Sequence, residues 1–595
     1  MTGPQKKLVR AQRQRRYNIF TMKINSFAKL LLASALALSQ PNTQAASQAP
    51  VAAENGMVVT AQHLATRVGV DVLKSGGNAV DAAVAVGYAL AVVYPAAGNL
   101  GGGGFMTILL ADGRKTFLDF REKAPLAATP NMYLDEEGNV VKGASTTGFL
   151  AVGVPGTVSG LEMARAGYGK MKREKLIAPA IKYAQDGFVL EQGDVDMLMT
   201  ATDAFKSDPA SAAIFLNNGK PFKVGQKLVQ RDLAQTLRLI SEHGSAGFYH
   251  GPVGKAIVTS IREGNGIITQ ADLNEYSTRE LKPIECTYRD YGIISAPPPS
   301  SGGVTLCEML NILEGYSLST LGFRSALAVQ YQIEAMRHAY VDRNSYLGDP
   351  DFVKNPLGRL LDKDYAAKIR TMITPFKAGV SIDIKPGIAP HEGSNTTHYS
   401  IIDKWGNAVS VTYTLNDWFG AKVTVAKTGV LLNNEMDDFT IKAGVANQYG
   451  LVQGEANAIA PGKRPLSSMS PTIVTKDNKP VMVLGTPGGS RIITTVLLTM
   501  INVIDYGMDI QQAVDAPRFH QQWLPEVTNL EPDAIDSETL MILEGWGHEF
   551  GSPQPANHVT AILVGAPTLG GTAVGKNRYY GANDTRRKTG LALGY

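Results

Sequence analysis

Pairs of short apolar segments around tight turns are the feature that most constrains the fold. Asp112-Gly113 separates two such segments, and Asp-Gly flanked by alternating apolar residues is a strong hairpin signal. Long apolar helices are predicted between the hairpins, at 79–93, 304–313 and 492–504. The pattern predicts antiparallel sheets covered by helices, an α+β fold. The predicted strand pairs are 105–110 with 115–120, 399–402 with 408–413, 471–475 with 481–484, and 558–564 with 578–581.

The positive charge of the chain is confined to its first 45 residues. The 595 residues carry a net charge of +4, yet residues 1–45 hold eight basic side chains and the first acidic residue is Glu54. Without that segment, 49 basic residues face 53 acidic ones, a net charge of −4. This distribution argues against a nucleic-acid partner. With 44% hydrophobic residues, the rest of the chain is too apolar to be disordered.

The basic segment is typical of a secretory signal peptide. Lys29 precedes the apolar run 30–38, and small and polar residues follow it. The run is shorter than the ~20 residues that a membrane-spanning helix needs. Met22 begins a more ordinary signal than Met1, so Met22 is a candidate true start; a disordered basic tail is the alternative. We expect residues 1–45 to be removed, leaving an exported protein that is periplasmic or secreted and not held in a membrane.

Familiar catalytic and metal-binding patterns are missing from the sequence. The nine histidines are scattered, no His/Cys group has metal-ligand spacing, and no Gly-x-Ser-x-Gly motif occurs. Gly101–Gly104 follows a helix and precedes a strand, so a close backbone contact explains it better than a phosphate loop. Cys286 and Cys307 are compatible with a disulfide or with two buried thiols. The sequence thus predicts neither a metal nor a cofactor.

A set of hydroxyl-rich and acidic segments carries more information together than any does alone. The sequence resembles the gamma-glutamyltranspeptidases, members of the N-terminal-nucleophile hydrolases, over essentially all of residues 56–595. The matching segments occur in the same order and at similar spacing. They are Leu118–Pro125, Ser394–Ser400, Thr412–Asn416, Leu432–Phe439, Arg464–Pro471 and Gly485–Arg491.

The resemblance implies a precursor that cuts itself. Its fold would be a four-layer αββα sandwich shared by two subunits, a large one of residues 46–395 and a small one of residues 396–595. The cut between Asn395 and Thr396 frees the α-amino group of Thr396. That amine has a reference pKa of about 7.7–8.0 and can accept the threonine hydroxyl proton. Thr397 competes as the nucleophile, but it gains no free amine.

The resemblance also implies the reaction. Thr396 would attack the γ-glutamyl amide of glutathione or a related compound, and the γ-glutamyl ester would pass to water, an amino acid or a peptide. Thr414 would support the nucleophile, and the N–H groups of Gly488 and Gly489 would bind the oxyanion. Arg121, Ser467 and Ser468 would bind the donor carboxylate. Asn416, Glu435 and Asp438 would bind its ammonium, and residues 442–454, with Tyr449, would form a lid.

Two other functions are compatible with parts of the sequence. A glutaryl or cephalosporin acylase of the same superfamily would use the same nucleophile, although a glutaryl group has no ammonium for Glu435 and Asp438. An exported solute-binding protein would share the signal peptide but would not be cleaved.

Overall fold

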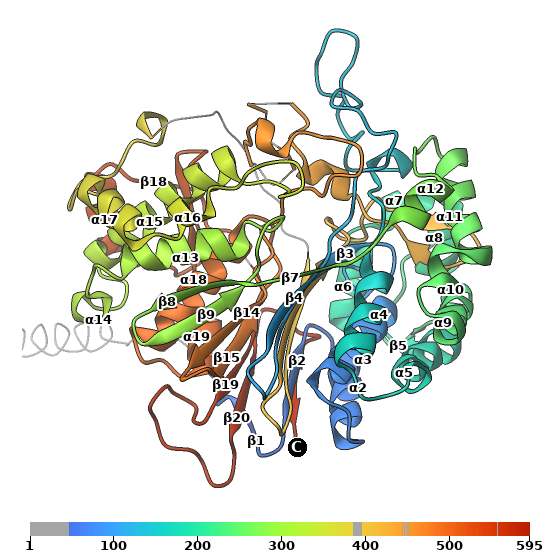
Figure 1. The fold of residues 1–595 in the computed structure, drawn as a ribbon, viewed down its shortest axis with the longest axis horizontal. Helices are drawn as coiled ribbons and strands as arrows, with labels where there is room; N and C mark the ends of the chain where they lie inside the picture. The colour runs from blue at the N-terminus through green and yellow to red at the C-terminus, as the bar shows by residue number, and fades with distance from the viewer. Residues whose placement is uncertain (1–46, 385–395, 443, 446, 449–450, 556) are drawn as a thin grey trace, which may run out of the picture. The chain divides into compact units, whose positions relative to one another are not determined.

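The computed structural model of the chain describes residues 47–384, 396–442, 444–445, 447–448, 451–555 and 557–595. Residues Ala49–Tyr595 form one compact unit. Two antiparallel sheets lie face to face at its centre, with helices on both outer faces (Figure 1). Within the described residues, no helix has both the length and the apolar character needed to cross a bilayer.

Each central sheet has seven strands, and segments far apart in the sequence pair within both. The first sheet has the order β1 (Val51–Ala53), β20 (Tyr579–Asn583), β19 (Thr560–Val564), β15 (Lys479–Gly485), β14 (Thr472–Lys476), β9 (Tyr291–Ser295) and β8 (Ile284–Tyr288). The second has the order β21 (Leu591–Gly594), β2 (Met57–Thr60), β10 (Thr397–Ile402), β11 (Ala408–Thr414), β3 (Gly103–Leu109), β4 (Lys115–Phe120) and β7 (Arg279–Leu281).

Apolar side chains from both sheets form the layer between them. Val59, Leu109 and Ile402 of the second sheet share a buried cluster with Val483 and Ile562 of the first. Successive side chains of a strand point to opposite faces, so the same strands also pack outward against helices. This explains why strands such as β10 are buried along their whole length.

Two groups of helices complete the layers. On the outer side of the second sheet, α2 (His63–Lys74), α3 (Ala79–Val93) and α4 (Thr157–Tyr168) contact its strands, and α5 (Arg173–Asp186), α9 (Arg231–His243), α10 (Ala246–Tyr249) and α11 (Gly251–Glu263) pack behind them. On the outer side of the first sheet, α13 (Gly302–Leu313), α18 (Arg491–Ile504) and α19 (Ile510–Asp515) contact its strands, and α15 (Ala326–Tyr346) and α17 (Lys363–Met372) pack against α13. The predicted α+β class and the four-layer αββα arrangement are confirmed (Figure 1).

The remaining helices and strands are mostly short. The helices are α6 (Gln192–Met199), α7 (Thr202–Ser207), α8 (Pro209–Phe215), α12 (Gln270–Glu275), α14 (Leu318–Leu321), α16 (Leu357–Leu360) and α20 (Ser537–Gly545). The strands are β5 (Phe188–Val189), β6 (Lys227–Leu228), β12 (Thr424–Val425), β13 (Val430–Leu431), β16 (Phe519–His520), β17 (Val527–Leu530) and β18 (Glu549–Phe550). Four 3₁₀ turns are η1 (Phe149–Ala151), η2 (Ser381–Asp383), η3 (Glu435–Asp438) and η4 (Glu455–Asn457).

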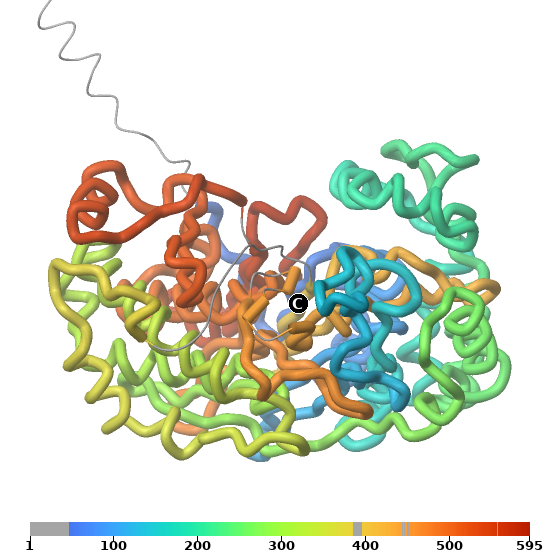
Figure 2. Tube along the Cα trace, turned by 90° about the horizontal axis from the view of Figure 1, so that it is seen from above, coloured from blue at the N-terminus to red at the C-terminus, as the bar shows by residue number. Residues whose placement is uncertain are grey.

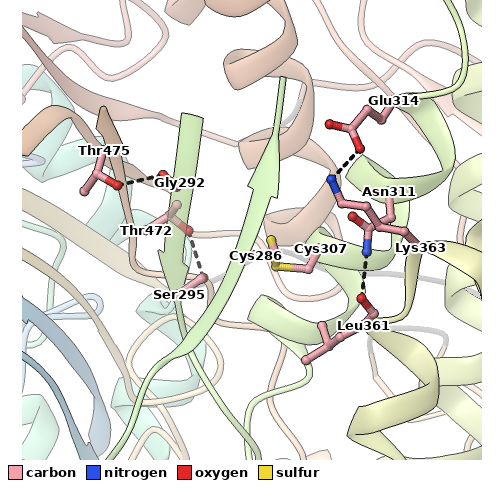
Figure 3. The surroundings of a disulfide bond; sticks show 10 residues. All are labelled: Cys286, Gly292, Ser295, Cys307, Asn311, Glu314, Leu361, Lys363, Thr472 and Thr475. Atoms are coloured by element: carbon pink, nitrogen blue, oxygen red, sulfur yellow. Dashed lines mark hydrogen bonds and ion pairs between the residues drawn. A yellow bond between two sulfur atoms is a disulfide. The ribbon is translucent and has the colours of Figure 1, made fainter. Parts of the chain in front are cut away.

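A disulfide joins Cys286 of β8 to Cys307 of α13, which settles the choice that the sequence left open (Figure 3). It ties the edge strand of the first sheet to a helix that covers that sheet. Beside it, the Asn311 side chain of α13 donates to the carbonyl of Leu361 at 3.1 Å. The bond therefore reinforces one outer layer of the sandwich.

We expect reduction of this disulfide to lower the stability of the protein without abolishing the fold. The two cysteines are 21 residues apart. Closing a loop of this size stabilises a protein by about 3 kcal/mol in the chain-entropy account. Thermal unfolding should therefore shift to lower temperature in dithiothreitol. A variant with both cysteines replaced by alanine should melt near the reduced protein and show no further shift with reductant; a wild-type melting curve that dithiothreitol leaves unmoved would contradict this.

Candidate active site

Thr396 lies at the head of β10, near the middle of the second sheet. Its side chain is buried, and its Oγ1 lies 3.3 Å from Oγ1 of Thr414, the last residue of β11. Thr397 is the next residue along β10 and so points to the opposite face. Its Oγ1 is buried and has no hydrogen-bond partner among the described residues. The structure thus separates the two candidate hydroxyls, and Thr396 is the one beside Thr414.

The glycine run before β3 positions Thr414. A Cβ atom on Gly102 would lie 2.0 Å from the carbonyl oxygen of Thr414, and one on Gly104 would lie 2.5 Å from that of Thr412. The side chain of Asn99 also donates to the Thr414 carbonyl at 2.8 Å. The run therefore permits a close backbone contact, as the sequence predicted, and holds the end of β11 in place.

Thr396 opens onto a cavity with an empty volume of about 330 Å³. The cavity wall contains most of the predicted site residues, although they come from distant parts of the sequence. Figure 2 shows the segment around 430–470 (orange) beside the loop that follows β4 (blue to cyan). The wall consists of Arg121, Arg343, Thr396, Thr414, Asn416, Glu435, Asp438, Leu451, Leu466, Ser467, Ser468, Met469, Gly489, Ser490 and Ile492.

Arg121 follows β4 and forms ion pairs with two predicted site residues. Its Nη1 donates to Glu435 and its Nη2 to Asp438, the two ends of η3. Glu122 lies 3.8 Å from the same guanidinium. The resemblance assigned the arginine to the donor carboxylate and the two acids to the donor ammonium. In the structure they contact each other directly, so one guanidinium pairs with two carboxylates.

Burial strongly affects the protonation of this cluster. It lowers the pKa of Arg121, but the neighbouring carboxylates, Glu435 first, outweigh it and hold the pKa above its usual value. Burial raises the pKa of Glu435, and Glu122 and Asp438 raise it further, while Arg121 lowers it only in part. The pKa of Glu122 is also raised by burial. Arg121 is therefore the neighbour that favours the ionised form of Glu435 and Glu122.

Gly488 and Gly489 form the turn from β15 to α18, with positive φ angles of 133° and 54°. Only glycine adopts the first without strain. A Cβ on Gly488 would also lie 2.1 Å from the Asn557 side chain. Gly489 lies in the cavity wall, and Gly488 precedes it. The turn thus contributes a residue without a side chain to the wall of the cavity that Thr396 also lines.

Asn416 and the two predicted serines complete the wall. Asn416 has a φ of 74°, and its N–H donates to Oγ1 of Thr414 at 2.8 Å. Its side chain donates to the carbonyl of Asn434 at 3.0 Å. The backbone of Ser467 is held from the loop before α13, because its N–H donates to the Pro299 carbonyl at 2.9 Å. Asn416 and Ser467 are therefore each held in place by hydrogen bonds to other parts of the chain.

The predicted lid is only partly within the described residues, and Tyr449 lies outside them. The N–H of Gln448 donates to Asp437 at 2.9 Å, and the other carboxylate oxygen of Asp437 accepts from Ser145 at 2.6 Å. Burial raises the pKa of Asp437 to about 6. Leu451 lies in the cavity wall. The described part of this segment is thus attached to the site through Asp437.

The sequence analysis missed Arg343, which lies in the cavity wall on α15. A signal was present in the sequence, because Asp342-Arg343-Asn344 is a run of three polar residues. In the structure, all three side chains are buried. Asp437, Leu466 and Met469 lie within the matching segments, and Leu451 lies within the predicted lid, but none of them was singled out.

His398 is the histidine nearest to Thr396 along β10, and its ring contacts Thr412 and Ser400. Burial lowers its pKa to about 3, so it is neutral at ordinary pH. It is not among the residues of the cavity wall. Among the described residues, no group of three or more His, Cys, Asp and Glu side chains could hold a metal ion.

Comparison with known sequences gives one consistent family. The chain is 73% identical over 575 residues to a glutathione hydrolase proenzyme of Pseudomonas sp. strain A14, covering 96% of this chain and 100% of that protein. It is 49% identical to the glutathione hydrolase proenzyme of Escherichia coli K12, covering 92% and 93%. Identity to the acylase ACY 1 proenzyme of Pseudomonas sp. strain SE83 is 38%, covering 88% and 92%.

Solved structures agree with this assignment. Cephalosporin acylase from Bacillus halodurans has a TM-score of 0.79 at 26% identity, covering 93% of this chain and 98% of that one. Helicobacter pylori gamma-glutamyltranspeptidase has a TM-score of 0.54 at 45% identity, covering 60% and 100%. The family model described as gamma-glutamyltranspeptidase matches residues 65–594. The chain therefore belongs to the gamma-glutamyltranspeptidase family.

Proposed function

We propose that this chain is the precursor of a γ-glutamyltransferase that also hydrolyses glutathione, with Thr396 as its nucleophile. The observation that carries the proposal is the cavity itself. It places the Thr396 hydroxyl in one wall together with Arg121, Glu435 and Asp438. The hydroxyl serves as the nucleophile. The three charged side chains can pair with the ammonium and the carboxylate on the α-carbon of a γ-glutamyl donor.

The nucleophile acts once its own amine is free. Self-cleavage between Asn395 and Thr396 creates an α-amino group with a reference pKa of about 7.7–8.0. This amine accepts the proton of the Thr396 hydroxyl, directly or through a water molecule. Thr414 Oγ1 lies 3.3 Å from the Thr396 hydroxyl and orients it by a hydrogen bond. His398 is neutral and lies outside the cavity wall, so it is not needed as the base.

The reaction runs in two half-reactions through a covalent ester. Thr396 Oγ1 attacks the γ-carbonyl carbon of the donor and forms a tetrahedral oxyanion, which the N–H groups of Gly488 and Gly489 stabilise. Collapse breaks the amide bond, and the leaving amine takes the proton. Water or the amine of an amino acid or peptide then attacks the γ-glutamyl ester, and the proton returns to Thr396. Ping-pong kinetics should follow.

Donor recognition follows from the charges of the wall. The donor ammonium is matched by the carboxylates of Glu435 and Asp438 and by the side-chain oxygen of Asn416. The donor carboxylate is matched by Arg121 and by the hydroxyls of Ser467 and Ser468. Because Arg121 already pairs with both acids, the ammonium and carboxylate of a bound donor join an ion-pair network that exists before binding.

The two products of cleavage, residues 46–395 and 396–595, should remain together as a heterodimer. Both parts contribute strands to both sheets: β10 and β11 of the second part pair with β2 and β3 of the first. The two cysteines of the chain both precede residue 395 and bond to each other, so no disulfide joins the parts. The association rests on non-covalent contacts: apolar packing, backbone hydrogen bonds and ion pairs such as those of Arg121 with Glu435 and of Arg289 with Asp505.

A denaturing gel with N-terminal sequencing of the purified protein tests the proposal. Two bands are expected without reductant, and the smaller should begin Thr-Thr-His-Tyr, the sequence from Thr396. Under native conditions the two should elute as one species. An uncut chain, or a small fragment with any other first residue, removes Thr396 as the nucleophile.

The N-terminal segment assigns the enzyme to an exported compartment. We infer that residues 1–45 are a cleaved signal peptide and that the mature enzyme is periplasmic or secreted. The basic, apolar and small-residue sections of the segment support this. Activity should be released by osmotic shock together with a periplasmic marker; activity that stays with the cytoplasmic fraction contradicts the assignment.

An acylase is the remaining rival, because the structural relatives include a cephalosporin acylase. We expect the enzyme to hydrolyse a γ-glutamyl 4-nitroanilide at least about tenfold faster than the glutaryl compound. Buried Glu435 and half-buried Asp438 can accept from the ammonium of a γ-glutamyl donor, which a glutaryl donor lacks, and one charge-assisted hydrogen bond contributes about 1.5–3 kcal/mol. Comparison of kcat/KM for the two anilides checks this, and faster glutaryl turnover favours the acylase.

A further inference from the structure

The cavity wall contains a second guanidinium, Arg343 on α15, that no carboxylate neutralises. The side chain is 1% exposed. Its three hydrogen bonds go to uncharged acceptors: Nε to Ser301 Oγ at 2.9 Å, Nη1 to Asn344 Oδ1 at 2.7 Å, and Nη2 to Ser468 Oγ at 2.9 Å. Among the described residues, no Asp or Glu oxygen lies within 4.0 Å of it.

This arrangement is costly for a buried cation. Burial lowers the pKa of Arg343 to about 10, although Tyr340 and Asp438 raise it in part. Arg121 in the same wall has two direct carboxylate partners instead. Buried charges are normally paired, and an unpaired one is retained where a ligand supplies the opposite charge. Arg343 therefore lacks an anion that a ligand could provide.

The hydrogen bonds of Arg343 also orient Ser468. A guanidinium can only donate, so Ser468 Oγ must accept from it and its own proton must point elsewhere. No acceptor for that proton is found among the described residues, and Ser468 lies in the cavity wall. The hydroxyl proton is thus available to a ligand in the cavity.

The same guanidinium fixes the neighbouring backbone through Ser301. Ser301 Oγ accepts from Arg343 and donates to the carbonyl of Ser467 at 2.7 Å, while the Ser301 N–H donates to that carbonyl at 2.8 Å. Ser467 and Ser468 are therefore held from α15 and from the start of α13, and both supports converge on Arg343.

We propose that Arg343 is a positioning residue for the donor carboxylate: it turns the Ser468 hydroxyl toward that carboxylate and supplies the positive charge that balances it. This rests on the proposed γ-glutamyl activity and extends it. A γ-glutamyl donor brings one ammonium and one carboxylate. Glu435 and Asp438 match the ammonium. Arg121 faces the donor carboxylate but already pairs with both acids, so Arg343 adds the positive charge that no acid among the described residues offsets within 4.0 Å.

Three 4-nitroanilide donors that differ only at the α-carbon test the proposal. The γ-glutamyl donor carries both charged groups, the glutaryl donor only the carboxylate, and the 4-aminobutyryl donor only the ammonium. For R343Q, kcat/KM relative to the wild type should fall about 10- to 100-fold with the first two donors, the effect of one charge-assisted hydrogen bond. It should change less than about threefold with the third. Equal losses with all three donors show a structural role and overturn the proposal.

Arg359 provides a matched control on the neighbouring α16. Its side chain is 44% exposed and pairs with Asp342, the residue before Arg343. R359Q should leave all three kcat/KM values near those of the wild type. The wild-type enzyme separates the proposed γ-glutamyl activity from the proposed role of Arg343. If the wild type does not turn over the γ-glutamyl donor, the proposed function is refuted. If the wild type is active and R343Q loses activity equally with all three donors, only the role of Arg343 is refuted.

S468A provides a second route if R343Q fails to mature. It removes the oriented hydroxyl and leaves Arg343 in place with its other two hydrogen bonds. About a tenfold loss confined to the two carboxylate donors supports the proposal. A loss shared by the 4-aminobutyryl donor, or no loss with any donor, overturns it.

Discussion

The variant T396A should be neither cleaved nor active. It should purify as one uncut chain, because the hydroxyl that attacks the preceding peptide bond is gone. Activity on γ-glutamyl donors should fall by about 10⁶-fold, as when other covalent nucleophiles are removed. T396S, which keeps a hydroxyl, should still cleave and retain part of the activity. Gel analysis and initial rates measure both effects.

Thr397 provides the control one residue away. Its buried Oγ1 has no hydrogen-bond partner among the described residues, and it is not in the cavity wall. Valine replaces the hydroxyl with a methyl group of similar size, so T397V should be neutral or slightly stabilising. T397V should mature and turn over donors like the wild type. A cleaved T396A, or an inactive T397V, would move the nucleophile to Thr397.

Sequence patterns predict elements whose signals are local. The helix predicted at 79–93 is α3 with the same bounds, because Asn78 and Asp81 form a capping box at its start. The hairpin around Asp112-Gly113 is β3 and β4, shifted by one or two residues at one strand. Each of these segments carries its own start, stop or turn residues, so no distant partner is needed to recognise it.

Strands that depend on distant partners were not predicted. β2 pairs with β10 and β21, so residues 57–60, 397–402 and 591–594 meet in one sheet. β2 and β21 have four residues each and no tight turn beside them. β7 and β8 lie at residues 279–288, outside all of the predicted strand pairs. These strands become recognisable only from the sheets that they complete.

The difference between local signals and distant contacts applies to the candidate active site as well. Conspicuous hydroxyls, acids and glycines at family spacing identify Thr396, Glu435 and Gly489, but not the contacts among them. The pairing of Arg121 with Glu435 and Asp438 spans more than 300 residues. Arg343 was missed because a single arginine in a helix is usually exposed. Its importance depends on the burial of α15 on all sides, including polar positions such as Gln330 and Glu334.

R121A should mature normally and bind γ-glutamyl donors poorly. Maturation should be unaffected because Arg121 forms no hydrogen bond to Thr396 or Thr414 among those observed. Truncation of one partner in a buried charge network costs about 2–5 kcal/mol, so KM should rise about 30-fold or more. Arg114 is the control at the other end of β4: its side chain is 70% exposed, and R114A should have a wild-type KM.

The pH dependence of R121A provides the sharper test. Burial raises the pKa of Glu435, and Arg121 is the neighbour that lowers it, so removing Arg121 raises that pKa further. Near neutral pH the Glu435 carboxyl of the variant then holds its proton more firmly and accepts less well from the donor ammonium. Raising the pH ionises it, and the KM of R121A should therefore fall as pH rises, more steeply than that of the wild type. If Arg121 acts only on the donor carboxylate, the two enzymes will instead show parallel KM profiles, because the protonation of Glu435 will not have changed.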